Sequence, residues 1–499
     1  MKKKYYITTP IYYVNDKPHI GHAYTSIAAD VIARFKKLEG YEVIFLTGTD
    51  EHGQKIEKAA KKLGYDNPQE FTDKISENFK NLTPILNLSN TDFIRTTEQR
   101  HIKYVKEIWR RLLDNQQIYL GKYSGWYAVR DEAFYNESEL VNGKAPTGAD
   151  VEWVEEPSYF FKLSAWQDKL LEFYEENPSF ILPETRSNEV ISFVKSGLND
   201  LSISRTSFKW GIGVPGQPDH IIYVWLDALF NYISALEDKK DIYWPCDLHI
   251  VGKDILRFHA VYWPAFLMAA NIELPKRVFA HGWWTNEGEK ISKSLGNVID
   301  PIELVNTFGL DYFRFFLIRE VTFGNDGNYS KTALITRANT ELANKVGNLI
   351  HRTASFIYKH CDKQIPTPYQ LDQEDLNILD QGYSLRKQIK AAIDNQSLHL
   401  ALEMIINFAS LANNYIDKNP PWILLKNDKK RTHTVLYVLT ECIRLIAILL
   451  QPFTPASAGK ILDYLNIENR RIETLDKNFA IIPGAQLTKP EIFFDKIEN

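Results

Sequence analysis

Two histidines near the N-terminus, His19 and His22, enclose Gly21 at a point where a predicted strand passes into a predicted helix. Imidazole N–H groups can donate hydrogen bonds to phosphate oxygens as negative charge builds up in an in-line displacement. The backbone N–H groups at a helix N-terminus also attract phosphate, and a glycine lets the chain approach a nucleotide closely. This spacing therefore predicts a nucleotide site. The alternative is a pair of surface histidines, because motifs this short often arise by chance.

A second segment, Lys290–Ser294, lies past the middle of the chain and combines two lysines with two serines ahead of Gly296. Such a loop is flexible and cationic. When a carboxylate displaces pyrophosphate from ATP, negative charge grows on the leaving group, and a mobile lysine that reaches it only in the transition state lowers the barrier. We assign that role to Lys293, with Lys290 in support. The alternative is a solvated basic loop.

The first segment needs a strand, a helix and a second strand to position it. Residues Tyr5–Thr9 favour a short strand that Pro10 closes, and apolar residues then recur at helical spacing from Gly21 to Gly40. Residues Tyr41–Leu46 are typical of a second buried strand. This order predicts a parallel sheet with a right-handed crossover.

Further along, the residue composition and the hydrophobic pattern of the chain change twice. Residues 117–222 are rich in Tyr, Trp, Gly and short strand-like pieces, a strand pattern returns at Asp247–Gly252, and residues 398–416 have an amphipathic helical pattern. We therefore predict an α/β fold, a doubly wound parallel sheet (Rossmann-like) with an inserted α+β domain, followed by a C-terminal α-helical bundle. The predicted segments are 1–116 and 223–286 for the two halves of the sheet domain, 117–222 for the insert, 287–345 for the region around Lys293, and 346–499 for the bundle.

Composition limits the classes of protein that fit. The 499 residues suffice for several domains, and a hydrophobic fraction of 44% allows a full core. The net charge of −4 gives no indication of RNA binding, so any RNA contact must come from local basic patches. Three widely spaced cysteines, Cys246, Cys361 and Cys442, favour neither a disulfide framework nor a cysteine-based zinc site, and suit a reducing cytosol.

Targeting signals are not apparent. The basic start Met1–Lys4 is followed by a predicted strand, and no stretch approaches the ~20 apolar residues needed to span a membrane. We therefore expect a cytoplasmic protein without membrane contact. The chain ends after a short polar tail, with no added segment that would drive dimerisation, so we expect a monomer.

The two nucleotide segments belong to a longer pattern. The chain resembles the methionyl-tRNA synthetase family of class I aminoacyl-tRNA synthetases from about Tyr5 to about Trp422, in the bacterial form without zinc-knuckle cysteines. The nucleotide segments point to the class, whereas the stretches around Trp225 and Trp422 point to methionine. The matching stretches are Thr9–Asn15, Gly48–Gly53, Val224–Ala228, Gly252–Ile255, Asn344–Asn348 with Arg352, and Asn414–Trp422.

This resemblance implies a two-step reaction. ATP and L-methionine form methionyl-adenylate and pyrophosphate, and the terminal ribose of tRNA(Met), including the initiator tRNA, then attacks the adenylate. Mg²⁺ is expected to arrive with ATP, held by phosphate oxygens and water. Positioning and charge stabilisation suffice without a covalent nucleophile. The implied catalytic residues are His19, His22, Lys290 and Lys293, and the implied ATP contacts are His19, Gly21, His22, Lys290, Ser292 and Lys293.

The resemblance also implies a methionine pocket. Apolar and aromatic walls suit a flexible thioether, because sulfur near an aromatic edge gains ~0.3–1.5 kcal/mol. Asp50 is expected to bind the α-ammonium group through a charge-assisted hydrogen bond. Asp227 is either a pocket residue or a helix N-cap, and Leu229 stands where some relatives carry proline. The implied pocket residues, several of which would be ordinary core by type alone, are Ile11, Tyr13, Trp225, Ala228, Leu229, Tyr232, Ile255 and His259.

Many relatives carry Cys-x-x-Cys pairs in the insert. Here Ala128 and Asp131 occupy the places of the first pair, and the loop of residues 143–148 contains no cysteine. Tetrahedral zinc needs four nitrogen or sulfur ligands, and the insert offers none at this spacing. We therefore expect no structural zinc, and an insert that packing alone holds together.

In the last third of the chain, the resemblance implies that Asn348, Arg352 and Trp422 read the anticodon of the tRNA. Unstacked bases are read by stacking on aromatic rings and by side-chain hydrogen bonds. Asn348 and Arg352 are four residues apart, so on a helix they share one face. The alternative is a packed tryptophan and a solvated polar pair. The basic run Lys429–Arg431 could contact phosphate or form a solvated loop.

Three other functions stay open at this point. A class I synthetase for another apolar amino acid, such as leucine, isoleucine or valine, would need a larger insert for editing, and one for cysteine would need a zinc-type site. A small-molecule adenylating enzyme would have no use for the helical last third. A tRNA-binding paralogue without activity would not need His19, His22, Asp50, Lys290 and Lys293.

Overall fold

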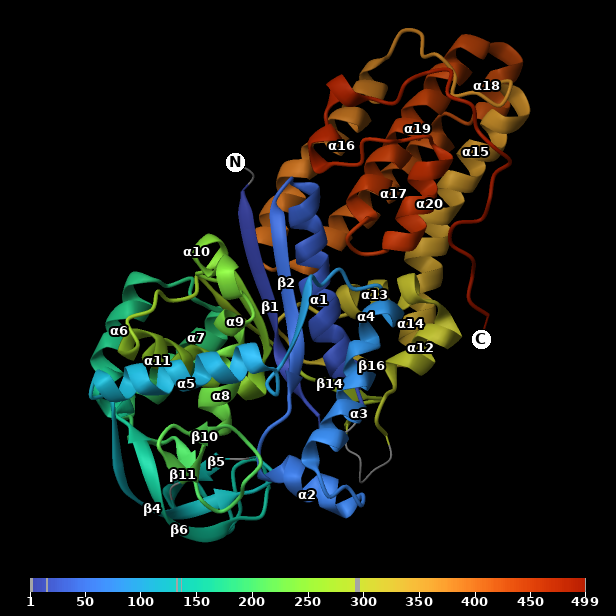
Figure 1. Ribbon diagram of the computed structural model, residues 1–499. Helices are drawn as coiled ribbons and strands as arrows, with labels where there is room; N and C mark the ends of the chain where they lie inside the picture. Colours follow the sequence, from blue (N-terminus) through green and yellow to red (C-terminus); the bar gives the residue numbers. More distant parts are fainter. Residues whose placement is uncertain (1–2, 15–16, 132, 136, 292–296, 499) are drawn as a thin grey trace. The chain divides into compact units, whose positions relative to one another are not determined.

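The computed structural model of the protein describes residues 3–14, 17–131, 133–135, 137–291 and 297–498 (Figure 1). Contacts group the chain into two compact units. The first, here called the sheet unit, consists of Lys4–Ala29 and Val43–His281. The second, the helical unit, consists of Met1–Lys3, Asp30–Glu42 and Gly282–Asn499. The five segments drawn from the sequence stay a prediction.

The sheet unit is built on a parallel sheet, as predicted. Its strand order is β3-β2-β1-β12-β13-β7, so β1 from the first predicted half lies directly beside β12 from the second. Ile7 pairs with Leu248 and Thr8 with His249. The strands are β1 (Lys4–Tyr13), β2 (Glu42–Asp50), β3 (Asp92–Arg95), β7 (Ile181–Leu182), β12 (Leu248–Gly252) and β13 (Val278–His281).

Strand β1 is longer than predicted. It passes through Pro10 and ends at Tyr13, so the prediction that Pro10 closes it was wrong. A proline removes one N–H donor, but its fixed φ is compatible with an extended chain. Ile7 and Thr8 are the residues of β1 that pair with β12, and Pro10 lies beyond them. The N–H group that Pro10 lacks is therefore not needed for the pairing of Ile7 and Thr8 with β12.

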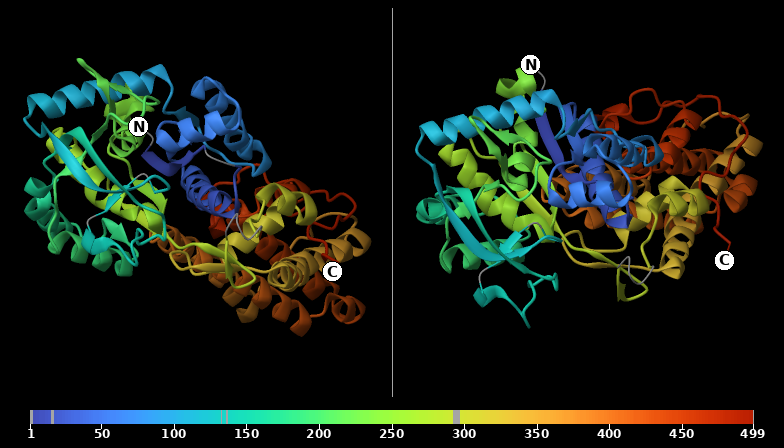
Figure 2. Two further views of the ribbon diagram at one scale, coloured as in Figure 1. Left: turned by 90° about the horizontal axis from the view of Figure 1, so that it is seen from below. Right: turned by 60° about the horizontal axis from the view of Figure 1, so that its bottom comes forward.

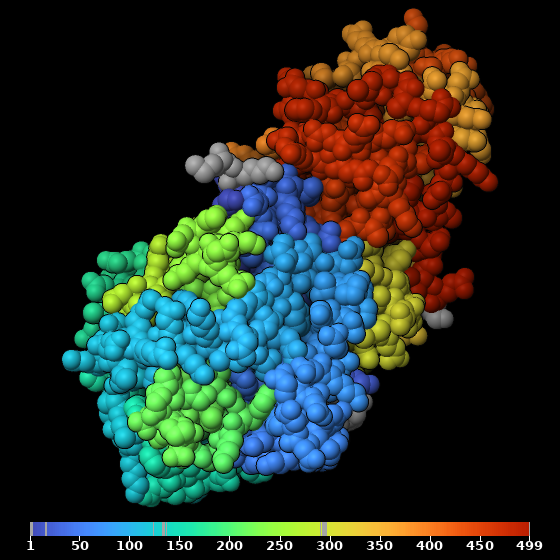
Figure 3. All heavy atoms as spheres, in the orientation of Figure 1, coloured from blue at the N-terminus to red at the C-terminus, as the bar shows by residue number. Residues whose placement is uncertain are grey.

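Helices pack around this sheet because one stripe of each is apolar. In α5 (Gln99–Asp114) the residues Val105, Ile108, Trp109 and Leu112 are buried at the spacing of one helix face. In the space-filling view, α5 lies at the surface next to the segment that carries α9 and α10 (Figure 3). The other helices of this unit are α1 (Ile20–Leu38), which the helical unit shares from Asp30 onward, α2 (Gln54–Lys62), α3 (Pro68–Lys80), α4 (Leu82–Ile85), α6 (Gln167–Glu176), α7 (Glu184–Lys195), α8 (Val224–Leu229), α9 (Asn231–Ser234), α10 (Lys240–Tyr243) and α11 (Trp263–Ala269).

The predicted insert contains two small antiparallel sheets. In one, β4 and β6 form a long twisted ribbon within the order β5-β4-β6-β8, and the other has the order β10-β11-β9 (Figure 2). The sequence indicated strand-like pieces at Tyr123–Val129 and Val151–Leu163; β4 begins five residues before the first range, and β6 lies within the second. The strands are β4 (Ile118–Ala128), β5 (Ala133–Tyr135), β6 (Glu152–Phe161), β8 (Leu201–Ser202), β9 (Ser204–Arg205), β10 (Gly213–Val214) and β11 (Gln217–Ile222).

The helical unit contains the predicted bundle. Its helix α19 (Lys429–Leu450) is apolar and long enough to cross a membrane, but 94% of its most apolar window is buried, which is typical of a core helix. A small sheet, β15-β14-β16, precedes the bundle. The other strands and α-helices described in this unit are β14 (Trp284–Asn286), β15 (Glu289–Lys290), β16 (Gly327–Tyr329), α12 (Pro301–Phe308), α13 (Leu310–Arg319), α14 (Lys331–Arg337), α15 (Asn348–His360), α16 (Gln373–Asp394), α17 (Leu398–Lys418), α18 (Pro421–Asn427) and α20 (Pro455–Tyr464), and the π-helical segment η7 (Ala338–Gly347) joins α14 to α15.

Within the helical unit, a buried ion pair joins the second half of α1 to α13. Nη2 of Arg314 lies 2.6 Å from Oδ2 of Asp30, and neither side chain is exposed. Arg314 also donates to the carbonyls of Pro452 and Phe453, at 2.9 and 3.1 Å. Nε of Arg34 reaches the same Asp30 oxygen at 2.7 Å, but this side chain is 22% exposed. The two arginines thus differ mainly in burial.

We expect Arg314→Ala to lower the free energy of unfolding by about 3–5 kcal/mol, because it leaves the Asp30 carboxylate buried with a weaker set of partners. Arg34→Ala removes a partly solvated partner of the same oxygen and should cost about 0–1 kcal/mol. Urea denaturation followed by circular dichroism measures both. Equal losses for the two variants would contradict the importance assigned to the buried pair.

Candidate active site

The first predicted nucleotide segment lies at the start of α1. The carbonyl of His19 accepts the first hydrogen bonds of the helix, from the N–H groups of His22 at 2.9 Å and Ala23 at 3.2 Å. The backbone N–H of Gly21 donates to Nδ1 of His19, and that of His19 donates to Nδ1 of His22, both at 3.1 Å. Because each Nδ1 accepts, each neutral ring carries its proton on Nε2, the nitrogen that can donate to a phosphate oxygen.

A side chain does not fit at Gly21. A Cβ atom there would lie 2.9 Å from Cε1 and 3.1 Å from Nδ1 of the His19 ring. The rings of His19 and His22 are 3.9 Å apart between centroids. Tyr12 and Phe79 meet the His22 ring edge-on, at 4.8 and 5.2 Å. The glycine therefore allows the His19 ring to lie over the helix start, in addition to the close backbone approach expected from the sequence.

The second predicted nucleotide segment is described only at its start. Lys290 ends β15, which pairs antiparallel with β14. Ser292 and Lys293 lie outside the described residues, so their contacts with ATP stay predictions.

Aromatic side chains gather where α8 meets the π-helical segment η5 (Phe258–Tyr262). Trp225 of α8 stacks on Phe258, with centroids 3.6 Å apart and planes 7° apart, and His259 faces Trp225 edge-on at 6.5 Å. A π-helical turn adds one residue to a helical turn and often occurs at functional sites. Of the predicted pocket residues, Leu229 and Tyr232 belong to the apolar core of this unit, Ile11, Trp225 and Ile255 pack against it, and Ala228 is also buried.

The hydrogen bonds of His259 fix the polarity of this cluster. Nδ1 lies 2.9 Å from the carbonyl oxygen of Ile255, so it carries the proton and donates. Burial lowers the pKa of His259 to about 4, so the ring is neutral at pH 7. Nε2 must then accept the bond of 2.7 Å from the Tyr232 hydroxyl. The Tyr232 oxygen therefore directs its proton to His259 and can offer only lone pairs to another neighbour.

Asp50 ends β2 and is buried except for a small part of its surface. Burial is the main cause that raises the pKa of Tyr232, and the nearby Asp50 carboxylate adds to the rise. These two predicted pocket residues therefore lie close enough to interact. Tyr13, by contrast, packs against a separate apolar cluster around Tyr12 and Phe79, with the Lys55 ammonium 5.1 Å from its ring centroid.

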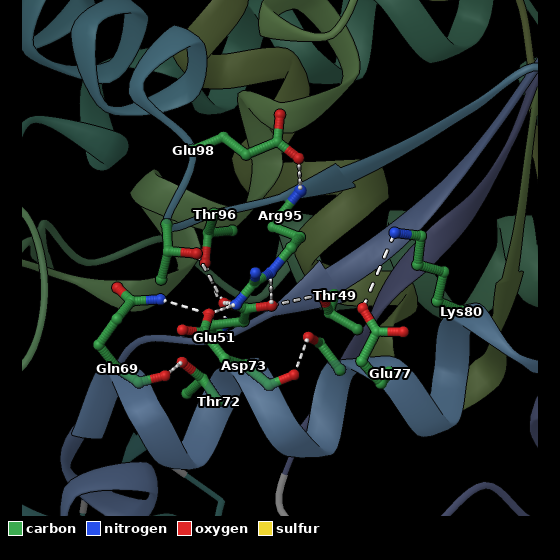
Figure 4. Close-up of polar contacts among 12 residues, drawn as sticks. Thr49, Glu51, Gln69, Thr72, Asp73, Glu77, Lys80, Arg95, Thr96 and Glu98 are labelled. Atoms are coloured by element: carbon green, nitrogen blue, oxygen red, sulfur yellow. Dashed lines mark hydrogen bonds and ion pairs between the residues drawn. The ribbon is translucent and has the colours of Figure 1, made fainter. Parts of the chain in front are cut away.

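The residue after Asp50 is anchored by a buried network (Figure 4). The Glu51 carboxylate is unexposed and accepts from Nε and Nη2 of Arg95, at 2.7 and 2.9 Å. The hydroxyls of Thr49 and Thr97 donate to it at 2.7 Å each. Arg95 also pairs with Asp73 of α3. The carboxyl ends of β2 and β3 are thereby fixed to each other and to α3.

Asp227, for which the sequence left two roles open, is not the N-cap of α8, because Tyr223 holds that position. Its unexposed carboxylate instead lies between two imidazoles. Nδ1 of His52 is 2.7 Å from Oδ2, and Nε2 of His101 is 2.7 Å from Oδ1. Asp227 thus joins the loop after β2, helix α5 and helix α8.

Sequence reasoning missed several residues of this region. Phe258 follows Ile255 by three residues and precedes His259, a spacing that places all three on one helix face and could have revealed it. His101 had no comparable signal, because it lies 126 positions from Asp227 in the chain.

The three predicted anticodon residues lie in the helical unit. Asn348 begins α15 and is exposed, and Arg352 lies one turn further along the same helix. The Arg352 guanidinium is 5.1 Å from the ring centroid of Trp422, and its Nη2 is 2.8 Å from Oδ1 of Asp417. Trp422 is 44% exposed. Arg352 and Trp422 therefore meet, and Trp422 remains accessible to solvent.

The basic run Lys429–Arg431 lies at the start of α19, and two of its side chains make contacts within the protein. Arg431 pairs with Asp375 at 2.5 Å and with Asp372 at 3.0 Å, both at the start of α16. Lys430 lies 5.5 Å from the ring centroid of Tyr369. The run therefore opens a helix instead of forming a solvated loop.

Around the positions where relatives carry zinc ligands, the insert has a small apolar cluster and a hydrogen-bond network. Ala128 is buried together with Ala145 and Ala149. The carboxylate of Asp131 accepts from Tyr135 at 3.1 Å and from the hydroxyl of Thr147. Across the described part of the chain, no group of three or more His, Cys, Asp and Glu side chains is placed to hold a metal ion.

Comparisons with known proteins agree with this geometry. The profile of "tRNA synthetases class I (M)" matches residues 5–150 and 138–354, and that of "Anticodon binding domain of methionyl tRNA ligase" matches residues 365–499. The methionine–tRNA ligase of Rickettsia felis is 59% identical over 100% of this chain and 99% of its own, and that of Brucella suis 54% over 99% and 98%. The solved Mycobacterium tuberculosis methionyl-tRNA synthetase in complex with methionyl-adenylate is 50% identical, with a TM-score of 0.96 over 99% of both chains.

A parallel sheet with this strand order, a helix that starts at His19–His22 and a C-terminal helical bundle define a class I aminoacyl-tRNA synthetase. The matches extend over the insert and the bundle as well as the sheet. Within that class, the chain belongs to the methionyl-tRNA synthetase family.

We expect the purified protein to contain no stoichiometric zinc, and its melting temperature to be unchanged by a chelator, because the Asp131 network holds the insert.

Asp131→Ala should lower the melting temperature, since it leaves the Tyr135 and Thr147 hydroxyls without this acceptor. Asp150→Ala is the matched control, because the Asp150 side chain is 90% exposed and pairs with Lys144 at the surface. One tightly bound zinc per chain would contradict this account.

Proposed function

We propose that the protein activates L-methionine with ATP to methionyl-adenylate and transfers the methionyl group to the 3′ end of tRNA(Met), the initiator tRNA included. The observation that carries this proposal is the similarity over the full chain to a synthetase solved with methionyl-adenylate, at a TM-score of 0.96. The match of the bundle to an anticodon-binding domain favours it over a small-molecule adenylating enzyme.

In the activation step, the methionine carboxylate attacks the α-phosphorus of ATP and pyrophosphate leaves. His19 and His22 donate hydrogen bonds from their Nε2–H groups to phosphate oxygens at the start of α1, where the helix dipole adds to the attraction. Lys293, supported by Lys290 and Ser292, meets the pyrophosphate as its charge grows. No proton transfer to these side chains is needed, because they act through charge and position.

Methionine binds with its α-ammonium at Asp50 and its thioether among the aromatic side chains. The wall is provided by Trp225, held by stacking on Phe258, and by Tyr232. The Tyr232 hydroxyl donates its proton to the hydrogen bond with His259, so it has no proton left to donate to the substrate. The part of the substrate next to Tyr232 therefore need not be a hydrogen-bond acceptor. A thioether, which is a weak acceptor, suits such a site. Ile11, Tyr13, Ala228, Leu229 and Ile255 complete the proposed pocket.

Magnesium enters this scheme as part of the substrate, MgATP. The described side chains provide no cluster that would hold the ion by themselves. Phosphate oxygens and water are ligands that Mg²⁺ prefers.

The helical unit reads the anticodon in this proposal. The exposed Trp422 provides an aromatic ring for base stacking, and Arg352 and Asn348 offer hydrogen bonds from one face of α15. We further propose that the protein acts as a monomer in the cytoplasm.

The test of the proposed function is ATP–pyrophosphate exchange, run separately with each standard amino acid, followed by charging of tRNA(Met) transcripts. Exchange that depends on methionine, together with charging of tRNA(Met), supports the proposal. Exchange with another apolar amino acid would indicate a different synthetase, and exchange without charging would indicate an adenylating enzyme.

We expect Lys293→Ala to slow methionine-dependent exchange by about 10²–10³-fold with a nearly unchanged methionine affinity, because the contact forms only in the transition state. Lys331→Ala, which removes an exposed lysine at the start of α14, is the control and should keep the wild-type rate. A Lys293→Ala enzyme with full exchange activity would refute the role given to this loop.

Trp422→Ala should reduce charging efficiency by about 5–150-fold while exchange is spared, because stacking on a base is worth ~1–3 kcal/mol. Asn348→Ala should act in the same direction, more weakly. Phe479→Ala, at an exposed aromatic residue of the same unit, should leave both reactions unchanged. Equal loss of exchange and charging in Trp422→Ala would mean that this residue serves folding.

A further inference from the structure

Two consecutive residues just after β2 make buried contacts with other elements. Glu51 binds Arg95 at the end of β3, and His52 contacts Asp227 on α8. Trp210 donates from Nε1 to the Glu51 carbonyl at 2.5 Å, and its own carbonyl accepts from the N–H of Gly53 at 3.1 Å. The His52 ring meets that of Trp210 edge-on at 5.5 Å. Asp50 therefore stands at the start of a short stretch in which consecutive residues are anchored.

The contact of His52 is with a fully buried anion. The Asp227 side chain is unexposed, as is that of His101, and His52 is 7% exposed. Burial alone would raise the pKa of the Asp227 carboxyl, but the charge and hydrogen bonds of His52 and His101 outweigh it and hold the pKa below its usual value. The carboxylate is thus ionised at neutral pH.

An ionised carboxylate can only accept, which fixes the direction of both bonds. Nδ1 of His52 and Nε2 of His101 must therefore carry protons and donate to Asp227. The other nitrogen of His101, Nδ1, lies 2.8 Å from the hydroxyl of Ser234 on α9. The chain of contacts runs from the β2 loop through α8 to α5 and α9 with a defined geometry at each step.

This chain of contacts spans the two sides of the proposed methionine pocket. His52 follows Asp50, the proposed ammonium ligand, by two residues. Asp227 follows Trp225, the proposed wall, by two residues on α8. A helix of six residues does not hold its position by its own backbone bonds, so α8 depends on its tertiary contacts. Asp227 is the one charged residue of α8, and its hydrogen bonds to His52 and His101 are the directional contacts of this helix described above.

We infer that Asp227 is a positioning residue of the methionine pocket, which holds His52 and His101 together and thereby keeps Trp225 at a set distance from Asp50. The inference rests on the proposed function, because it presumes that methionine binds between these two residues. It predicts that loss of the Asp227 contacts weakens methionine binding and leaves ATP binding intact, since His19 and His22 belong to other elements.

The first test is Asp227→Asn, which keeps the size of the side chain but turns an NH₂ group toward one of the two imidazole N–H donors. We expect the KM for methionine in pyrophosphate exchange to rise by about tenfold or more, with the KM for ATP within about twofold and most of kcat retained at saturating methionine. Equilibrium dialysis with methionine alone should give the same fold-change in Kd.

Conservative replacements separate positioning from bulk stability. The Nδ1 position of histidine is mimicked by the amide nitrogen of asparagine, and the Nε2 position by that of glutamine. His52→Asn and His101→Gln should therefore restore most of the methionine affinity that His52→Ala and His101→Ala lose. These pairs also keep the test decisive if Asp227→Asn fails to fold.

The control for general destabilisation is Glu441→Gln. Glu441 is buried in the helical unit and accepts from Arg444 at 2.6 and 2.8 Å, so its loss should lower the melting temperature without a change in the KM for methionine. An unchanged methionine KM in folded Asp227→Asn, or equal changes in both KM values and kcat, would overturn the inference. Failure of the wild-type protein to catalyse methionine-dependent exchange would instead overturn the proposed function.

Discussion

The close approach of β2 to β3 is the constraint on which this active-site edge depends. A Cβ atom at Gly48 would lie 2.0 Å from the carbonyl oxygen of Ile94, so only glycine allows the two strands to lie side by side in this register. That register brings Arg95, at the end of β3, within hydrogen-bond distance of the Glu51 carboxylate, just past the end of β2. Asp50, between Gly48 and the anchored Glu51, is therefore placed by backbone geometry before any ligand is present.

From that edge outward, short elements are positioned by polar contacts more than by their own propensity. Helix α8 and the π-helical segment η5 are each too short to be stable alone. The stacking of Trp225 on Phe258 joins α8 to η5, and the bond between Tyr232 and His259 joins α9 to η5. Such contacts have preferred distances and angles, whereas apolar packing alone tolerates rearrangement. A pocket for a flexible thioether needs walls of this fixed kind.

The sequence allowed the parallel sheet, the insert and the helical bundle to be predicted, because these depend on periodicity and turn residues that short windows reveal. It also predicted the helix start at His19–His22, where the motif itself forms the N-terminal turn. The extension of β1 past Pro10 was not foreseen, since the pairing partner of a strand cannot be read from the strand. The same holds for Asp227 and His101, whose contact joins residues 126 positions apart. The loop that carries Lys293 stays a prediction from sequence and resemblance.

The two imidazole neighbours of Asp227 explain why a buried carboxylate is useful at this position. Replacing a buried ion pair with apolar residues of similar volume is often neutral or stabilising, so stability alone does not account for a carboxylate between two imidazoles. An apolar side chain at Asp227 would fill the space, but it would leave the N–H groups of His52 and His101 without an acceptor and free to seek others. The carboxylate accepts both at 2.7 Å and so fixes their distance to each other. The charge fixes the direction of both bonds, and it thereby ties His52, two residues after Asp50, to the helix that carries Trp225.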